Sequence, residues 1–124
     1  MIKSAKNLDI SLEIGDYLTE YTKEIKDGIN KKADELSKEA VEKLKTTSPK
    51  KTGKYAKGWK ATKEGNTITI QNGTSGQLTH LLEFGHVTRN GRSRTAAQPH
   101  IAPVEEWLTK TYDDEVKKII EKSN

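Results

Sequence analysis

The chain has no cysteine, only one phenylalanine and one methionine, and three prolines among its 124 residues. Without cysteine there is no disulfide, no thiol nucleophile and no zinc ribbon, and the composition fits assembly in a reducing cytoplasm. No apolar run approaches the roughly 18 residues that a membrane span needs, and residues 1–9 lack an apolar stretch of signal-peptide length. We therefore expect a protein without a membrane segment that stays in the cell that makes it.

Apolar residues are also scarce. They make up 31% of the chain, whereas roughly 45–50%, counting glycine, is typical of soluble domains. We expect a single domain over 1–124, because two domains would each be too small to bury a useful core. A thin core without disulfides gains stability most readily by burying surface against neighbouring subunits. The composition therefore predicts an oligomer.

The formal net charge of +4 is unevenly distributed. Residues 1–50 hold equal numbers of basic and acidic side chains, residues 51–101 hold eight Lys and Arg against two Glu, and residues 102–124 hold four Lys against six acids. The basic excess therefore lies in the middle of the chain. This middle part is a candidate surface for nucleic acid or for an acidic protein, and an ordinary solvated surface is the plainer interpretation.

Helical periodicity is the strongest structural signal, and it predicts a long amphipathic helix over 14–47 behind an N-terminal extension over 1–13. Apolar side chains recur there at steps of three or four; they are Ile14, Leu18, Tyr21, Ile25, Ile29, Ala33, Leu36, Ala40 and Leu44. Such a helix would be roughly 45 Å long, which exceeds the width of a compact domain of this size. Part of it is therefore expected to project or to pack on another subunit.

The helix should end before Pro49, because a residue that precedes proline disfavours helical angles. Two runs flanking Glu64–Gly65–Asn66 predict a β-hairpin over 54–72, and the second alternates threonine with isoleucine. The sequence further predicts a short helix over 77–85, a flexible basic loop over 86–98 and a C-terminal helix over 102–122. The expected fold is α+β, with the long helix packed on a small antiparallel sheet.

Three histidines and one glutamate invite a test for metal binding. His80, Glu83 and His86 form an H-x-x-E-x-x-H string, and His100 follows. Positions six apart lie on different sides of a helix, whereas a helical zinc site needs histidines four apart. The alternative is that Glu83 and the histidines hydrogen-bond backbone or one another around a buried turn. We expect no metal, no cofactor and no catalytic residue, since nucleophile elbows and phosphate-binding glycine motifs are also missing.

The basic stretch from Lys51 to Lys63 contains Tyr55 and Trp59, which could stack on nucleic-acid bases while lysines hold the phosphates. Lysines at every third position of an alternating strand point to both faces, however, and form no continuous stripe. The alternative is that both aromatic side chains pack inward while the lysines keep the strand soluble.

Three segments resemble the neck family of long-tailed bacteriophages, whose members are called head-tail joining, tail completion or minor tail proteins. The resemblance rests on a P-x-x-T-G turn, an E-F-G segment and a P-H-x-x-P entry to the last helix. Here they stand in the family's order and spacing, within a similarity that spans about residues 15–120. Its residues are Pro49, Thr52, Gly53, Glu83, Phe84, Gly85, Pro99, His100 and Pro103.

The resemblance implies a structural virion protein and no enzyme. It implies a ring, commonly of six subunits, that joins the DNA-filled head to the tail tube. The implied partners are further copies of the chain, an adjacent head-closure or connector protein, the tail tube or a tail terminator protein, and double-stranded DNA in the central channel. The implied location is the head-tail junction of the virion, after assembly in the host cytoplasm.

The family motifs would then have structural and interfacial roles. Thr52 and Gly53 would form the turn from the long helix to the sheet, and the segment 83–85 would be held in place before the loop. The residues at 99, 100 and 103 would seat the last helix. The side chains expected to face the DNA channel or a partner are Lys51, Lys54, Lys57, Arg89, Arg92 and Arg94.

Two other function classes compete with this interpretation. A small basic nucleic-acid-binding module would shift DNA with a steep dependence on salt. A small metal-dependent hydrolase would retain metal and lose it when His80 or His86 is replaced. An assembly subunit should show neither property strongly.

Overall fold

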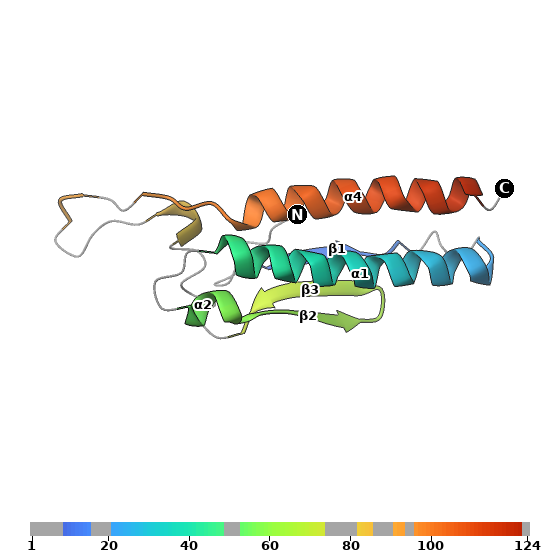
Figure 1. Cartoon of the computed structure of the whole chain (residues 1–124), viewed down its shortest axis with the longest axis horizontal. Helices are drawn as coiled ribbons and strands as arrows, with labels where there is room; N and C mark the ends of the chain where they lie inside the picture. The colour runs from blue at the N-terminus through green and yellow to red at the C-terminus, as the bar shows by residue number, and fades with distance from the viewer. Residues whose placement is uncertain are drawn as a thin grey trace.

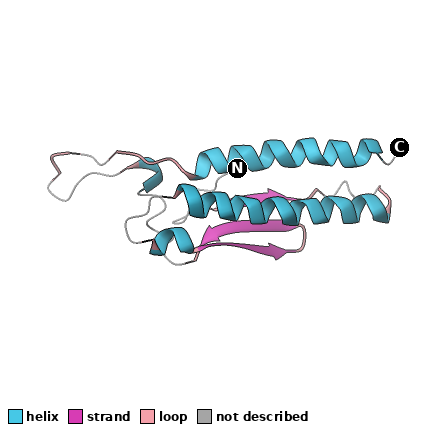
Figure 2. Cartoon of the chain, viewed as in Figure 1, coloured by secondary structure: helices cyan, strands magenta, loops and turns pink. Residues whose placement is uncertain are grey.

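The computed structural model describes residues 9–15, 21–48, 53–73, 82–85, 91–93 and 96–122. Its elements are β1 (Ile10–Glu13), α1 (Lys23–Thr47), α2 (Lys54–Lys57), β2 (Trp59–Glu64), β3 (Thr67–Asn72) and α4 (Ile101–Lys122). The helices α1 and α4 lie side by side and run in opposite directions, and α1 covers one face of the three-stranded antiparallel sheet (Figure 1, Figure 2). The expected α+β class, with a long amphipathic helix packed on a small sheet, is confirmed.

The long helix α1 has a clear beginning and end. Thr22 is its N-cap and accepts a hydrogen bond from the backbone N–H of Ile25 at 3.3 Å. At the other end Ser48, which precedes a proline, is extended, and its N–H reaches Leu44 O at 2.9 Å. The buried side of the helix repeats at helical spacing; it consists of Ile25, Ile29, Ala33, Leu36, Ser37, Ala40, Val41 and Leu44.

The helix predicted from residue 14 is wrong over its first part, because it begins only at Lys23. The predicted N-terminal extension 1–13 is likewise wrong over its last residues, which form the strand β1. Ile10, Leu12 and Ile14 are buried and alternate with exposed side chains. This period of two buries all three apolar side chains on the same side of the sheet, which a helix could not do. Residues 16–20 lie outside the described part of the chain.

The sheet has the order β1-β3-β2, so β3 is the central strand. β3 pairs antiparallel with β1, where Leu12 lies opposite Ile68. β3 also pairs antiparallel with β2, and the predicted turn between these two strands contains Gly65 at a φ of 58°. Along β3 every second residue is buried, whereas β2 is exposed beyond Trp59. The side of the sheet that faces α1 therefore carries its apolar residues.

The predicted hairpin over 54–72 is correct for its two strands and wrong at its beginning. Residues 54–57 form the short helix α2, which follows Gly53 at a left-handed φ of 82°. Tyr55 and Ala56 are both buried, at 5% and 4% exposure. Consecutive residues of a strand point to opposite faces, so a strand at this edge could not bury both. A helical turn can.

The remaining predictions concern the segment between β3 and α4. Helical residues occur at 82–84, followed by Gly85 at a φ of 75°, and the first part of the expected helix 77–85 lies outside the described residues. Most of the expected loop 86–98 also lies outside them. Its described residues at 91–93 and 96–98 are exposed, and the former lie beyond the body of the molecule (Figure 1). The last helix spans Ile101–Lys122, close to the expected 102–122.

The core lies between the two long helices and the sheet. Its fully enclosed members come from every layer and include Ile29 and Leu44 of α1, Ile70 of β3, and Ile101 and Leu108 of α4. Among the described helices, none combines the length and the apolar character needed to cross a membrane. The thin core predicted from composition is thus concentrated along the α1–α4 contact and the inner face of the sheet.

Candidate functional site

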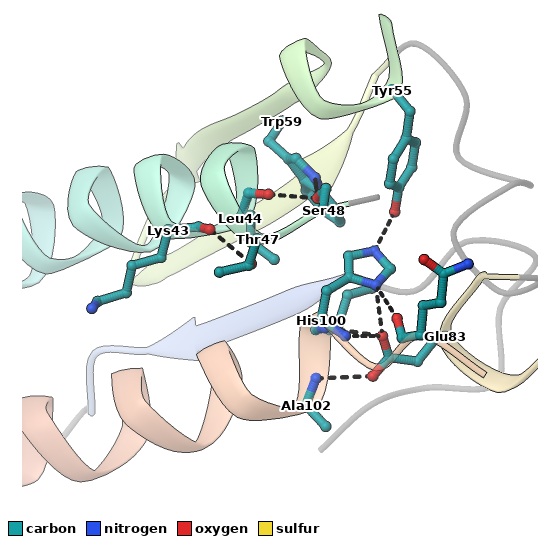
Figure 3. A network of polar contacts seen from close by, with 11 residues as sticks. Lys43, Leu44, Thr47, Ser48, Tyr55, Trp59, Glu83, His100 and Ala102 are labelled. Atoms are coloured by element: carbon teal, nitrogen blue, oxygen red, sulfur yellow. Dashed lines mark hydrogen bonds and ion pairs between the residues drawn. The ribbon is translucent and has the colours of Figure 1, made fainter. Parts of the chain in front are cut away.

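The buried carboxylate of Glu83 caps the N-terminus of α4. Its Oε1 accepts hydrogen bonds from the backbone N–H groups of His100 at 2.7 Å and Ile101 at 3.0 Å, and its Oε2 accepts from Ala102 at 3.1 Å (Figure 3). The next residue, Pro103, has no N–H to satisfy. The orphan donors of the first turn are therefore all accounted for by one side chain. A negative charge at this end also matches the helix dipole.

The imidazole of His100 lies between Tyr55 and Glu83 (Figure 3). Its Nδ1 is 2.8 Å from the carbonyl oxygen of Gln98 and 3.1 Å from Glu83 Oε1, and its Nε2 is 2.7 Å from the Tyr55 hydroxyl. A carbonyl oxygen only accepts, so Nδ1 must carry a proton. In the neutral ring the Tyr55 hydroxyl then donates to Nε2, and the buried ring nitrogens are both satisfied.

Aromatic packing connects this network to the sheet. The rings of Tyr55, Trp59 and His100 meet edge to face. The distance between ring centroids is 5.8 Å for Tyr55 and Trp59, 5.6 Å for Tyr55 and His100, and 6.2 Å for Trp59 and His100. The indole N–H of Trp59 donates to Ser48 Oγ at 2.8 Å, and the amide of Asn72 donates to Tyr55 O at 2.7 Å. These contacts form one polar clamp, a name we keep for the set Ser48, Tyr55, Trp59, Asn72, Glu83, Gln98 and His100.

The clamp holds both ends of the segment that connects Glu83 with His100. In addition to the cap, the backbone N–H of Gln98 donates to Leu82 O at 2.7 Å. The residues at 82 and 98 therefore lie side by side, although they are far apart in the sequence.

Other residues of the family motifs lie around the clamp. Gly53 starts α2, Gly85 is buried, and Pro99 and Pro103 are exposed on either side of the α4 start. Phe84 is an exposed large apolar residue, with 50% of its surface accessible. Pro49 and Thr52 lie outside the described residues.

The described basic residues among those singled out from the sequence are not members of the clamp. Lys54 and Lys57 are exposed on α2, and Arg92 is exposed in the described segment 91–93. Lys51, Arg89 and Arg94, like His80 and His86, lie outside the described residues. Within the described part of the chain, no group of three or more metal-ligating side chains comes together.

Sequence reasoning missed the Tyr55–His100 hydrogen bond and the Trp59–Ser48 hydrogen bond. The alternative that Tyr55 and Trp59 pack inward is confirmed, because the two residues are 5% and 2% exposed. Their polar atoms need partners once buried. The sequence therefore predicts that these polar atoms form hydrogen bonds. It does not identify their partners, which lie up to 45 residues away in the chain.

Residues 13–85 match a family model described as "Bacteriophage HK97-gp10, putative tail-component". The comparison with curated proteins gave no match, and neither did the comparison with solved structures. The matched range covers more than half of the chain and includes α1, the hairpin and the segment up to Gly85. It agrees with the resemblance carried by the motif residues. The chain belongs to the HK97 gp10-like family of bacteriophage tail components, structural proteins of the virion that are not enzymes.

Proposed function

We propose that this chain is a subunit of a ring at the bacteriophage neck, where it joins the DNA-filled head to the tail tube. Its partners in this proposal are further copies of itself, the adjacent head-closure or connector protein, and the tail tube or tail terminator protein. DNA passes through the centre of the ring and is contacted weakly and without sequence preference.

One observation carries the proposal beyond family membership, and it is the polar clamp. Glu83, His100 and Tyr55 are buried, and their polar atoms form hydrogen bonds with one another and with the backbone at the start of α4. A catalytic or ligand-binding group would need access to a substrate. The clamp instead supports a positioning role, because it fixes residues 82–83 against the start of α4.

The segment between Gly85 and Gln98 suits a contact with another protein. It carries Arg89, Arg92 and Arg94 and no acid, and its described residues at 91–93 are exposed beyond the body (Figure 1). Phe84 adds an exposed aromatic side chain at its base. Arginine and aromatic residues are enriched at protein interfaces. We therefore assign this end of the molecule to the neighbouring ring of the neck.

Electron microscopy of lysates tests the proposal. The gene is deleted from the phage or prophage that carries it, and particles are examined by negative stain. Filled heads beside free, unjoined tails, or beside tails without a proper end, are the expected result. Normal infectious particles would remove the assembly function altogether.

A basic nucleic-acid-binding module is the second candidate, and exposed lysines on α2 and β2 favour it. It predicts that the purified chain shifts a DNA fragment at moderate salt and that the apparent affinity falls steeply as salt rises. The neck proposal predicts weak binding. The same deletion experiment also separates the two, since a DNA-binding accessory protein would leave head-tail joining intact.

A further inference from the structure

The strand β2 is an open edge of the sheet. Among the described strands it pairs with β3 alone, and this pairing runs without a bulge from Trp59 to Glu64. In Figure 1, β2 forms the border of the molecule on the side opposite α4. Every residue of the strand after Trp59 is exposed. An exposed edge strand of this kind is a template on which a further strand can pair.

The backbone groups that point away from β3 belong to Ala61 and Lys63. The carbonyl oxygen of Gly58 accepts a hydrogen bond from the N–H of Gly73 at 2.9 Å, so the backbone of residue 58 faces β3. Along an antiparallel strand, residues that face the neighbouring strand alternate with residues that face away. The backbone groups of the even-numbered residues of β2 therefore face β3 as well. Those of residues 61 and 63 lie at the open edge.

The side chains of the same two residues lie on the α1 side of the sheet. Ala61 is opposite the buried Ile70, and Lys63 is opposite the buried Ile68. A lysine that points inward often protects an edge strand from pairing. Here its ammonium forms an ion pair with Asp34 of α1 at 3.7 Å. The charge is therefore held against α1 of its own chain and does not oppose a second strand at the edge.

Two copies of β2 can pair antiparallel in three central registers that bring open backbone groups together. If Ala61 lies opposite Ala61, Lys60 meets Thr62 and no charges are matched. If Lys63 lies opposite Lys63, two ammonium groups meet on the α1 side. If Ala61 lies opposite Lys63, Lys60 of each copy meets Glu64 of the other, and Thr62 meets Thr62. Only the third register matches charge, and it does so twice.

We propose that two copies of the free chain pair antiparallel through β2 in this third register, with the two-fold axis at Thr62. Ala61 of each copy then exchanges both backbone hydrogen bonds with Lys63 of the other. The pairs formed by Lys60 and Glu64 occupy positions without backbone hydrogen bonds, where opposite side chains come closest. Opposite charges at such positions stabilise a strand pair. The two sheets become one continuous sheet.

A hollow between α1 and β2 adds apolar surface to this contact. It has a volume of about 450 Å³, and its lining includes Val41, Ala61 and Ile68. Directly opposite residues of an antiparallel pair point to the same face. The α1 helices of the two copies therefore lie on the same side of the joined sheet, and the two hollows meet where the strands join. The aliphatic part of Lys63 of the second copy then covers the exposed methyl group of Ala61.

This contact goes beyond the proposed ring and does not rest on it. A two-fold contact joins the same patch of two copies and is complete with them, whereas a ring needs contacts between two different patches. The contact therefore concerns the chain before assembly, when it covers an edge that is otherwise open to uncontrolled strand addition. Because the contact is small, we expect a weak dimer that dissociates on dilution.

Sedimentation equilibrium of the purified chain over a range of concentrations measures the pairing. We expect a monomer–dimer equilibrium. Lys60→Glu or Glu64→Lys places like charges at both symmetric positions and should raise the dimer Kd roughly tenfold. The exchange Lys60→Glu/Glu64→Lys restores opposite charges and should return the Kd to near that of the parent chain. A parent chain that stays monomeric at about 1 mM, where even weak association is detected, would overturn the contact.

Matched controls separate this register from a general effect of charge. Lys31→Glu and Glu39→Lys make the same changes of net charge on the exposed side of α1 and should leave the Kd unchanged. Equal weakening by reversals on α1 and on β2, or an exchange variant that does not recover, would overturn the proposed register. Thermal unfolding of each variant distinguishes a lost contact from a lost fold.

A single cysteine at the two-fold axis tests the contact without changing its charge. The chain has no cysteine of its own, and the β-carbons of directly opposite residues lie about 5 Å apart. With oxidised glutathione as oxidant, two Thr62→Cys chains give up their thiol hydrogens and form one disulfide, and the oxidant leaves as two reduced glutathione molecules. Ser11→Cys, exposed on the other edge strand β1, is the control and should remain uncrosslinked. Cross-linking of Ser11→Cys in place of Thr62→Cys would assign the contact to β1 and overturn the proposal.

Discussion

Glu83 Oε1 lies 2.7 Å from the backbone nitrogen of His100, although 17 residues separate the two in the chain. Through this contact the side chain that precedes the arginine-rich segment caps the helix that follows it. The stability of α4 and the position of the segment's base are therefore coupled. Substitutions at the clamp should reveal this coupling.

Glu83→Ala should lower the free energy of unfolding by about 3 kcal/mol, because three backbone N–H groups, two of them in buried hydrogen bonds, lose their acceptor. Glu83→Gln keeps one acceptor oxygen but places an amide N–H near Ala102, so a loss of about 1–2 kcal/mol is expected. Urea unfolding measures both. Glu106→Ala, exposed on the same helix, is the control and should change stability by less than about 0.5 kcal/mol. Equal effects at 83 and 106 would contradict the capping role.

Tyr55→Phe should cost about 1–2 kcal/mol, because the buried Nε2 of His100 loses its partner while the ring packing remains. The measurement is the midpoint of urea unfolding. Thr46→Ala also removes a hydroxyl hydrogen bond, but an exposed one, and it should have a much smaller effect. A Tyr55→Phe protein as stable as the parent chain would mean that the hydrogen bond contributes nothing.

Gly28→Ala should stabilise the protein by about 0.5–1 kcal/mol, since Gly28 lies inside α1 and alanine is the better helix former. The new Cβ would lie 3.4 Å from Ile119 Cγ2, an ordinary contact. Gly53→Ala has free space around it but a φ of 82°, so it should destabilise by about 1 kcal/mol. The two melting temperatures should therefore shift in opposite directions. A shared direction would show that local space, and not backbone conformation, decides the effect.

Burial raises the pKa of Asp9 above its usual 3.8, and its Oδ1 is buried without a hydrogen-bond partner among the described residues. The folded state then binds the proton more tightly than the unfolded chain. The contribution of Asp9 to stability is therefore most favourable below pH 3.8 and is lost as the pH rises through the raised pKa.

Asp9→Asn should accordingly stabilise the protein at pH 7 and have a smaller effect below pH 3.8. Urea unfolding at several pH values measures this difference. Glu13→Gln, exposed at the end of β1, the strand that follows Asp9, is the control. A benefit of Asp9→Asn that grows as the pH falls would have the wrong sign and would contradict the assignment.

Replacing Arg89, Arg92 and Arg94 with glutamate should abolish head-to-tail joining and leave the retention of DNA in preformed heads unchanged. The reason is that reversed charge opposes docking on an acidic neighbouring ring. Microscopy counts joined particles, and nuclease protection measures retained DNA. An equal reversal at Lys23, Lys31 and Lys38 of α1 is the control. Joined particles with leaking DNA would instead assign these arginines to the DNA channel.

Much of the architecture follows from local sequence patterns. Apolar spacing in α1 and α4 and the Gly65 turn between β2 and β3 each arise from neighbours a few residues apart, and the structure has these elements where the patterns are clearest. The strand β1 was missed because Ile14 fits two periods at once. It continues the alternation of Ile10 and Leu12, and it also starts a helical spacing with Leu18. Only pairing with β3 decides between them.

The sequence by itself determined the two long helices, the hairpin, the absence of cysteine chemistry and the unequal distribution of charge. Tertiary structure alone decided that Glu83 caps α4 and that Tyr55 reaches His100. The physical reason is range. Periodicity and turn chemistry act over a few residues, whereas a hydrogen bond between buried side chains depends on how packed elements bring distant positions together.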